Sequence, residues 1–437
     1  MAVTVTPELT GIVGLLALVV LLALRVPVGI AMLVVATAGY ALIVSPDSAL
    51  SRLGSDAFTG GTTYSLSVIP LFIFMGLLLA QAQVGKDLYA LLDALLRRLR
   101  GGLAMSTIGA SAIFGSVSGS AVGSASTMSV VAMPEMRRYR YDDGLAAACT
   151  AVGGTLGALI PPSAVLVLYG ILTEESIGRI LIGGIVPGIV TTLLLLATAW
   201  IIIKLRPRLA PSVEASVQWR RLLPLASRVW AIPAIFGLSM GGLYLGVFTP
   251  TEAGAAGAGL ALLYGLLTRR LSWTAFRDAT SQTVLISAMI FLVVIASRMF
   301  GFFLSVTRIP QLLADFVQGL DLRPFLVIAM IFLIYFALGA LMDEIAILVI
   351  MTPIMYPIVT GLGYSGVWFG VASIMMLLVG LLTPPVGIIV YVVSGITDVN
   401  VGRVFRSVVP FWVTLIAAVA LVVAFPEIIM FLPDLMG

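Results

Sequence analysis

Ile160-Pro-Pro-Ser-Ala-Val-Leu-Val167 lies within one long apolar segment, and Thr383-Pro-Pro-Val-Gly-Ile-Ile-Val390 lies within another in the second half of the chain. A Pro-Pro pair inside a helix removes two backbone donors and clashes with the preceding turn. Each segment is therefore predicted to be a helix that breaks at its prolines. The break frees backbone carbonyls in the interior of the protein, and the rest of the fold is predicted around these two breaks.

The composition places the chain in a membrane. Of 437 residues, 60% are hydrophobic and only 10% are charged, and the mean hydropathy is +1.16. A water-soluble protein could not carry such a surface. Because a helix needs about 20 apolar residues to cross a bilayer, the chain has room for about a dozen spans with short loops, and none for a soluble domain. The net charge of +4 reflects basic loops and does not indicate nucleic-acid binding.

The scarcity of reactive side chains excludes several kinds of chemistry. The chain has one cysteine, Cys149, and no histidine. Internal disulfides, zinc sites built from Cys and His, and catalytic triads that need an imidazole are therefore excluded. An intramembrane enzyme that uses Asp343 and Glu344, or Ser163, is a less favoured alternative, because no histidine or nearby lysine would activate a nucleophile.

Two apolar stretches are too long for one simple crossing, residues 103–136 and 325–359. Arginines bracket the first stretch on both sides, at positions 97, 98, 100, 137, 138 and 140. Because basic residues favour the cytoplasmic side, both ends are expected there, and the stretch is predicted to turn around Gly115–Gly123 as a re-entrant hairpin. The same topology makes 325–359 a second hairpin that enters from the outside, where both chain termini are also expected.

The two halves of the chain share a second pattern besides the Pro-Pro pair. Val130-Val-Ala-Met-Pro-Glu-Met136 closes the first predicted hairpin, and Val349-Ile-Met-Thr-Pro-Ile-Met355 closes the second. Both patterns recur in the same order, and the two halves enter the membrane from opposite faces. This is an inverted repeat, with which many secondary transporters form ion and substrate sites near the bilayer midplane. Channels also use re-entrant hairpins and are an alternative class.

Polar and small residues gather at the predicted hairpin tips and helix breaks. Hydroxyls and glycine carbonyls are hard oxygen ligands that suit Na⁺, and hydroxyls can also donate to a carboxylate. Close packing of small residues is the alternative for the serines, and N-capping of the returning helix is the alternative for the acidic residue at the second tip. The candidates at the tips are Ser116, Ser118, Gly119, Ser120, Ser124, Ser126, Thr127, Gly339 and Asp343, and those at the breaks are Gly153, Thr155, Pro161, Ser163, Gly380, Thr383 and Pro384.

Arg298 lies in the middle of the apolar segment Leu285–Leu304. An unpaired guanidinium is unfavourable there, so this side chain needs a partner, water or headgroups. It is a candidate for binding an anionic substrate. An ion pair with an acid on a neighbouring helix, or a position at the outer interface, is the alternative.

Together these motifs resemble the large membrane subunit of tripartite ATP-independent periplasmic (TRAP) transporters of the DctM or SiaM type. The resemblance spans the whole chain and rests on Arg25–Ala31, Phe114–Met136, Gly157–Ser163, Gly246–Ala253, Met342-Asp343 with Thr352-Pro-Ile, and Leu382–Gly387. It implies an all-α integral membrane protein, an elevator-type secondary transporter with inverted repeats, two re-entrant helical hairpins and broken transmembrane helices. The expected location is the bacterial inner membrane, with both termini periplasmic.

The resemblance also implies a cargo, partners and a site map. The cargo is a small organic anion such as a C4-dicarboxylate or sialic acid, driven by two or more Na⁺ ions. The partners are a four-helix membrane subunit of the DctQ or SiaQ type and a periplasmic substrate-binding protein. One Na⁺ site is expected between the Ser116–Ser126 tip and Gly153–Thr155, the other between Gly339–Asp343 and Gly380–Thr383, with the substrate between the tips. A stand-alone Na⁺/dicarboxylate elevator symporter without a binding protein is the alternative.

The predicted domains alternate along the chain. Scaffold helices are expected in residues 1–100 and 229–322. The transport domain is expected in residues 101–180 and 323–400, each containing one hairpin and one broken helix. Residues 181–228 are expected to form a connecting helix with a partly helical cytoplasmic arm, and 401–437 a C-terminal helix.

Overall fold

The computed structural model describes residues 6–211, 219–319 and 323–436, and all the regular elements in these ranges are helical. Seven helical segments in these ranges, some of which join two consecutive helices, are long and apolar enough to cross a membrane. This confirms the predicted all-α membrane architecture.

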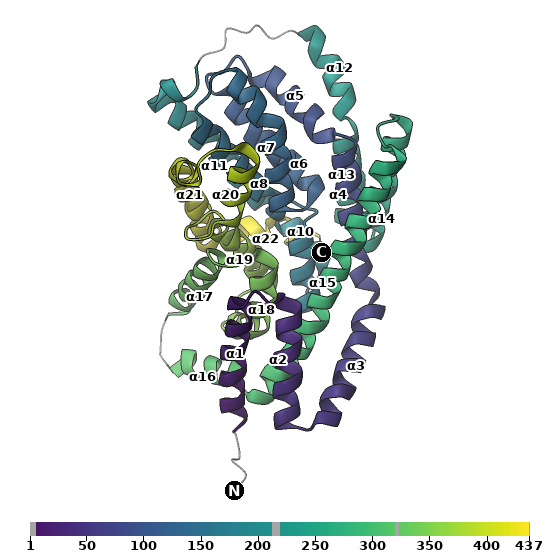
Figure 1. The fold of residues 1–437 in the computed structure, drawn as a ribbon, viewed down its shortest axis with the longest axis vertical. Helices are drawn as coiled ribbons and strands as arrows, with labels where there is room; N and C mark the ends of the chain where they lie inside the picture. Colours follow the sequence, from purple (N-terminus) through teal and green to yellow (C-terminus); the bar gives the residue numbers. More distant parts are fainter. Residues whose placement is uncertain (1–5, 212–218, 320–322, 437) are drawn as a thin grey trace.

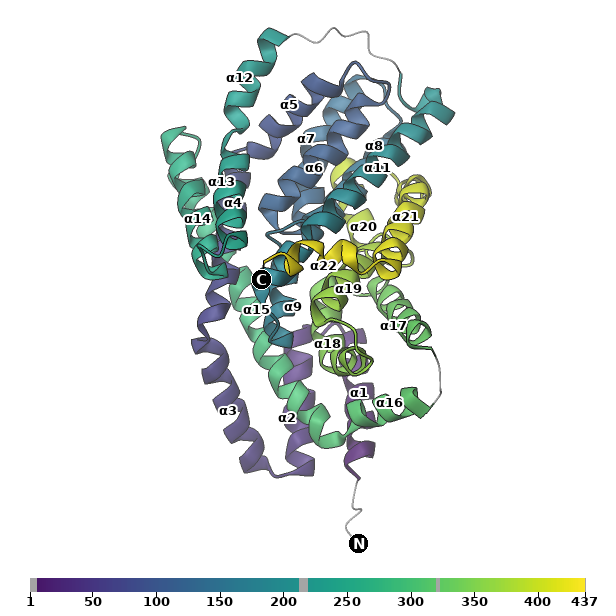
Figure 2. The same ribbon diagram turned by 180° about the vertical axis from the view of Figure 1, so that it is seen from behind.

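Two long helical rods run beside each other through the molecule (Figures 1 and 2). One consists of α3 (Pro46–Thr62), a short 3-10 turn η1 (Tyr64–Ser67) and α4 (Val68–Gln81); the other is the single helix α15 (Trp273–Thr307). The 35 residues of α15 extend over about 52 Å, more than the apolar thickness of a bilayer. Helices α1 (Pro7–Ala23) and α2 (Val28–Ile43) pack beside α15, α14 (Pro250–Leu267) packs beside α4, and α13 (Ala231–Tyr244) packs on α14.

The rods differ from the prediction at two places. Helix α3 was not predicted, because its charged residues Asp47, Arg52 and Asp56 interrupt the apolar pattern. Its start is nevertheless set locally, since the Ser45 hydroxyl accepts a hydrogen bond from the Ser48 amide and Pro46 occupies the first turn. Helix α15 begins at Trp273, earlier than the apolar segment Leu285–Leu304 of the sequence, and Ser272 caps it.

Each half of the chain then forms a helical hairpin, as predicted. In the first half, α5 (Val84–Leu96) precedes the hairpin. The hairpin itself consists of α6 (Gly102–Ser118) and α7 (Ala121–Arg138) and is here called hairpin 1. In the second half, α16 (Ile309–Gly319) precedes the hairpin, which consists of α17 (Pro324–Gly339) and α18 (Glu344–Gly361) and is here called hairpin 2. Hairpin 1 turns at Gly119, within the predicted range, with a left-handed φ of +63° that favours glycine.

The two predicted helix breaks are confirmed. The helix after hairpin 1 is divided into α8 (Asp143–Leu159) and α9 (Ala164–Thr173), and the helix after hairpin 2 into α19 (Gly366–Gly380) and α20 (Ile388–Thr397). The Pro-Pro pair lies in the gap in both cases. The order of hairpin and broken helix is therefore the same in both halves, as an internal repeat requires.

The repeats interlock at the centre of the molecule. Helix α7 of hairpin 1 packs on α20, and α18 of hairpin 2 packs on α9, so each hairpin contacts the far half of the other repeat's broken helix. Figures 1 and 2 show hairpin 1 in the upper part of the molecule, with α8 beside it, and hairpin 2 in the lower part, with α19 beside it. The two hairpins thus approach the centre from opposite ends.

The remaining helices are α10 (Ile177–Gly183), α11 (Ile185–Leu205), the 3-10 turn η2 (Pro207–Leu209), α12 (Trp219–Val229), α21 (Val401–Ala424) and α22 (Glu427–Asp434). They lie around this centre, except α12, which packs on α5 and α13. Helix α11 packs on α6, α8 and α21, and α21 packs on α8 and α19. The prediction of one C-terminal helix is wrong, because the helix ends at Ala424 and a second one starts after Pro426. The described part of the predicted arm, η2 and α12, is helical.

Candidate ion and substrate site

The tip of hairpin 1 lies directly against the first helix break. The Gly119 carbonyl accepts a hydrogen bond of 3.3 Å from the Ala164 amide, the first residue of α9. A Cβ atom at Gly119 would lie only 2.8 Å from the Pro162 carbonyl oxygen. The absence of a side chain at Gly119 therefore lets the tip approach the broken helix.

The serines at this tip are joined to each other and to the backbone. The Ser118 and Ser124 hydroxyls are 2.6 Å apart, and the Ser120 hydroxyl accepts a hydrogen bond from the Gly123 amide as the cap of α7. Ser116 donates to the Ile113 carbonyl. Ser126 and Thr127 lie half-buried on α7. Each hydroxyl oxygen retains acceptor capacity, so these contacts are compatible with a cation ligand as well as with packing.

The face of α8 that meets the tip differs from the predicted one. A Cβ at Gly157 would lie 2.7 Å from the Ser120 carbonyl oxygen, whereas a Cβ at Gly153 would lie 2.6 Å from the Ser111 hydroxyl, farther down hairpin 1. Thr155 is buried and donates to the Val152 carbonyl. Gly157, one turn closer to the break, is therefore the glycine of α8 beside the tip, a position that the predicted site map assigned to Gly153–Thr155.

The prolines at the first break set carbonyls free. Pro161 and Pro162 have no N–H, so Gly157 and Ala158 lose the amide donors that would follow them by one turn. The Ser163 hydroxyl donates to the Ala158 carbonyl at 2.6 Å and accepts from the Leu166 amide at 3.4 Å. Ser163 thus joins the two half-helices, and the backbone of Gly157 lies beside the serine tip.

The tip of hairpin 2 repeats this arrangement with different residues. The Ala340 carbonyl accepts a hydrogen bond of 3.2 Å from the Val386 amide, which follows the second Pro-Pro pair. Gly339 and Gly380 face each other so closely that a Cβ at Gly380 would lie 2.6 Å from the Gly339 Cα. Asp343 caps α18 by accepting from the Ile345 and Ala346 amides at 3.1 and 3.0 Å. Capping, one of the two predicted roles of Asp343, is confirmed.

Thr383 is held by a residue that the sequence did not indicate. The Trp412 indole on α21 donates to the Thr383 hydroxyl at 2.7 Å, and Thr383 donates to the Val379 carbonyl. The Trp412 ring also packs on Phe336 of hairpin 2. Pro384 beside it is exposed. A single tryptophan in a C-terminal apolar helix carries no motif, so only the tertiary structure reveals this contact.

The structure does not bring Arg298 to the hairpin tips. It lies on α15 beside Pro353 and Pro357 of α18, about 2.5 turns or more from the tip end of that helix. The other predicted site residues lie on the two hairpins and the two broken helices. Arg298 belongs to a separate cavity.

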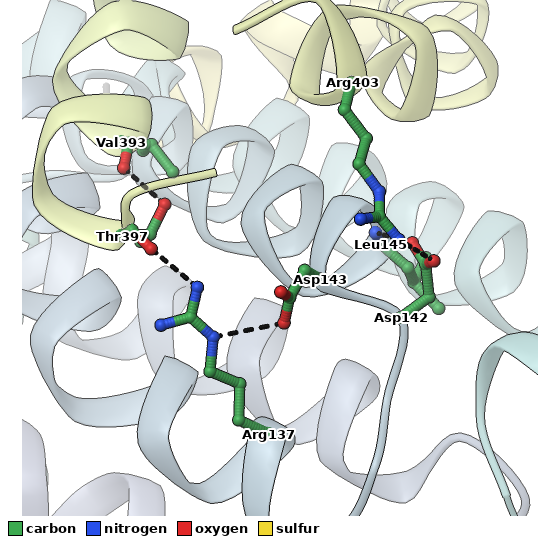
Figure 3. Close-up of polar contacts among 7 residues, drawn as sticks. All are labelled: Arg137, Asp142, Asp143, Leu145, Val393, Thr397 and Arg403. Atoms are coloured by element: carbon green, nitrogen blue, oxygen red, sulfur yellow. Dashed lines mark hydrogen bonds and ion pairs between the residues drawn. The ribbon is translucent and has the colours of Figure 1, made fainter. Parts of the chain in front are cut away.

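Charged residues join the two repeats at the end of hairpin 1 (Figure 3). Arg137 pairs with Asp143 at 3.1 Å and donates to the Thr397 carbonyl of α20 at 2.6 Å. Arg403 of α21 donates to Asp142 at 2.6 Å, and the Leu145 amide donates to the same carboxylate. These contacts hold the start of α8 against α20 and α21.

The Asp142–Arg403 pair gives a prediction for pH dependence. Burial raises the pKa of the Asp142 carboxyl, but the Leu145 amide and the Arg403 guanidinium outweigh it, so the pKa lies below the ordinary 3.8. A carboxyl whose pKa is lower in the folded protein stabilises the fold at any pH above its pKa in the unfolded chain. This contribution is lost as the pH falls through the pKa that the carboxyl has in the folded protein. Arg403→Gln should lower the free energy of unfolding by less than about 1 kcal/mol at pH 6, and the difference from wild type should shrink below pH 3.8.

Denaturant unfolding at several pH values measures this difference. Arg406→Gln is the matched control, because Arg406 is exposed on the same helix and makes no ion pair within the described ranges. A difference between Arg403→Gln and wild type that grows on acidification would contradict the assignment.

Comparison with known proteins adds to this geometry. Residues 15–428 match the family model "Tripartite ATP-independent periplasmic transporter, DctM component". The chain is 31% identical to the sialic acid TRAP transporter large permease protein SiaM of Vibrio cholerae, over 94% of this chain and 95% of that protein. It is 29% identical to the C4-dicarboxylate TRAP transporter large permease protein DctM of Pseudomonas aeruginosa, over 91% and 92% of the two chains.

A solved structure shares the fold. The YdaH transporter of Alcanivorax borkumensis superposes with a TM-score of 0.62 at 15% sequence identity, over 87% of this chain and 88% of that one. At this identity the similarity concerns the arrangement of helices alone. It supports the all-helical fold described above.

Proposed function

Because the chain belongs to the DctM component family of tripartite ATP-independent periplasmic transporters, we propose that it is the large permease subunit of a Na⁺-coupled importer of a small organic anion. The proposed cargo class is a carboxylate or sulfonate. Relatives named for sialic acid and for C4-dicarboxylates support an anionic cargo.

One observation carries the Na⁺ proposal, namely that two hairpin tips lie on two broken helices. Each tip brings carbonyl and side-chain oxygens beside a helix end whose amide donors are replaced by proline. The first proposed site draws on Ser116, Ser118 and Gly119 with the Gly153–Thr155 turn, and Gly157 is proposed as an addition because it lies against the tip residues Ser120 and Ser124. The second draws on Gly339, Asp343, Gly380 and Thr383. The anion is proposed to lie between the tips, against the hydroxyls of Ser120, Ser124, Ser126, Thr127 and Ser163.

The proposed transport step is movement of the interlocked centre past the long rods. The moving part comprises the hairpins and broken helices of residues 101–180 and 323–400, and the static part comprises residues 1–100 and 229–322. The contacts of α7 with α20 and of α18 with α9 support a single moving body, because they join the two repeats directly. Rigid-body motion of one repeat assembly around a fixed site is how such transporters alternate access.

The proposed location is the bacterial inner membrane, with both termini in the periplasm. The proposed partners are a small four-helix membrane subunit and a periplasmic substrate-binding protein. The family name itself implies a tripartite assembly with a periplasmic component. An intramembrane enzyme is disfavoured, because the family is one of transporter permeases.

Uptake by proteoliposomes tests this proposal. The chain and its cognate small subunit are reconstituted in proteoliposomes, and the cognate binding protein is added outside. Uptake of labelled anions is then measured with and without an inward Na⁺ gradient. Uptake should require both the Na⁺ gradient and the loaded binding protein. Na⁺-driven uptake of free anion at the same rate without binding protein would instead support the stand-alone symporter, and uptake that is indifferent to Na⁺ would refute Na⁺ coupling.

A further inference from the structure

A cavity of about 370 Å³ lies between the long helix α15 and hairpin 2, away from both tips. Its wall includes Arg298, Phe302 and Ser305 of α15, Gln311 of α16, and Pro353 and Pro357 of α18. Figure 2 shows these three helices meeting in the lower part of the molecule. The volume is in the range of small-molecule sites in proteins.

Arg298 is the charged group of this cavity. Within the part of the chain that the structure describes, no carboxylate forms an ion pair with it and no hydrogen bond from its guanidinium is found. It lies about 14 Å along the axis from the end of α15, between stretches of apolar residues. A guanidinium in such surroundings is stabilised by an anion or by water, because it would otherwise cost several kcal/mol.

The other lining groups favour an anion that has an apolar body. Gln311 and Ser305 line the same cavity and supply further hydrogen-bond donors, and Arg presents its donors as a planar fork that matches a carboxylate or a phosphate. Phe302, Ala314 and the prolines supply apolar walls. Gly301 leaves space in the wall, since a Cβ there would meet no atom within 4 Å.

We propose that the cavity around Arg298 and Gln311 is a second oxyanion site, distinct from the site between the hairpin tips, which takes a carboxylate or phosphate group attached to a short apolar chain. The site lies across the boundary between α15 and hairpin 2. Its occupant therefore binds only when these two elements have the arrangement seen here, and it stabilises that arrangement. The inference does not depend on Na⁺ coupling or on a binding protein.

Saturation-transfer NMR with butyrate, on the full chain in phosphatidylcholine nanodiscs, tests the proposal. Arg298→Gln should raise the Kd for butyrate at least about tenfold, because it removes a charge-assisted pair of hydrogen bonds. Gly301→Leu should have a similar effect by filling the cavity while leaving the charge in place. Arg308→Gln is the control, since Arg308 is exposed at the end of the same helix, and it should leave the Kd within about a factor of two.

The source of the natural anion is tested by adding phosphatidylglycerol to the nanodiscs. Competition with butyrate in wild type, together with loss of bound phosphatidylglycerol from Arg298→Gln, identifies a lipid headgroup as the occupant. Butyrate binding that is undiminished by phosphatidylglycerol identifies a soluble organic anion as the natural occupant. Both results support an oxyanion site. Equal butyrate affinity in wild type, Arg298→Gln and Gly301→Leu overturns the proposal, and Gly301→Leu decides the matter by itself if Arg298→Gln does not fold.

Discussion

Replacing Gly380 with valine should abolish uptake and lower the free energy of unfolding by about 3 kcal/mol or more. A Cβ at this position would lie 2.6 Å from the Gly339 Cα and 2.7 Å from the Gly339 carbonyl carbon. Both are backbone atoms, so no side-chain rotation can relieve the clash. Hairpin 2 would have to move away from the second broken helix, and the proposed ion site between them would be lost. Thermal unfolding and proteoliposome uptake measure the two effects.

Gly259→Val is the matched control for this change. Gly259 is exposed on α14, and a Cβ there would meet no atom within 4 Å. The same substitution should therefore leave stability and uptake close to wild type. Wild-type uptake by Gly380→Val would show that hairpin 2 and the broken helix are not in contact during transport.

Replacing Asp343 with asparagine should raise the Na⁺ concentration for half-maximal uptake about tenfold, equivalent to about 1.4 kcal/mol of Na⁺ binding, while leaving the fold intact. Asn caps helices about as well as Asp, so the hydrogen bonds from the Ile345 and Ala346 amides can persist. The negative charge, however, is removed from the proposed ion site. Uptake as a function of Na⁺ concentration gives the first quantity, and thermal unfolding gives the second.

Asp343→Ala separates the two roles of this residue. It should weaken Na⁺ dependence to a similar degree and should also lower the free energy of unfolding by about 1 kcal/mol, because the cap is lost. If Asp343→Asn instead behaves as wild type in Na⁺ dependence while Asp343→Ala is destabilised, the residue is a cap alone and is not an ion ligand.

The features predicted correctly from the sequence are those that depend on local chemistry. Pro161-Pro162 and Pro384-Pro385 each break a helix, because proline lacks the backbone N–H that a helix needs. Gly119 forms the turn of hairpin 1 because the turn requires a positive φ, which glycine adopts readily. Capping by Asp343 is one of the two roles predicted from an acidic residue at the second hairpin turn. Such rules need no knowledge of the neighbouring helices.

The features that were missed depend on how distant helices cross. Gly153 and Gly157 differ by about one turn, and only the packing of α8 on hairpin 1 decides which of them reaches the tip. Trp412 donates a hydrogen bond to Thr383 within the second half of the chain, and Arg403 donates one to Asp142 of the first half. No sequence pattern links the partners of either contact. Helix α3 was missed because its charged residues interrupt the apolar pattern, although the helix packs on α2 and α15.

The central claim is that the two hairpins enter the membrane from opposite faces, and side-specific labelling of single cysteines tests it most directly. Cys149 is the only native cysteine and is buried, so Cys149→Ala provides the background. Leu99→Cys and Arg138→Cys report the base of hairpin 1, and Arg323→Cys and Gly361→Cys report the base of hairpin 2; all four positions are exposed. An impermeant thiol reagent should label the hairpin 1 pair only from the cytoplasmic side and the hairpin 2 pair only from the periplasmic side. Labelling of all four from the same side would contradict the inverted repeat, and with it the proposed site and transport mechanism.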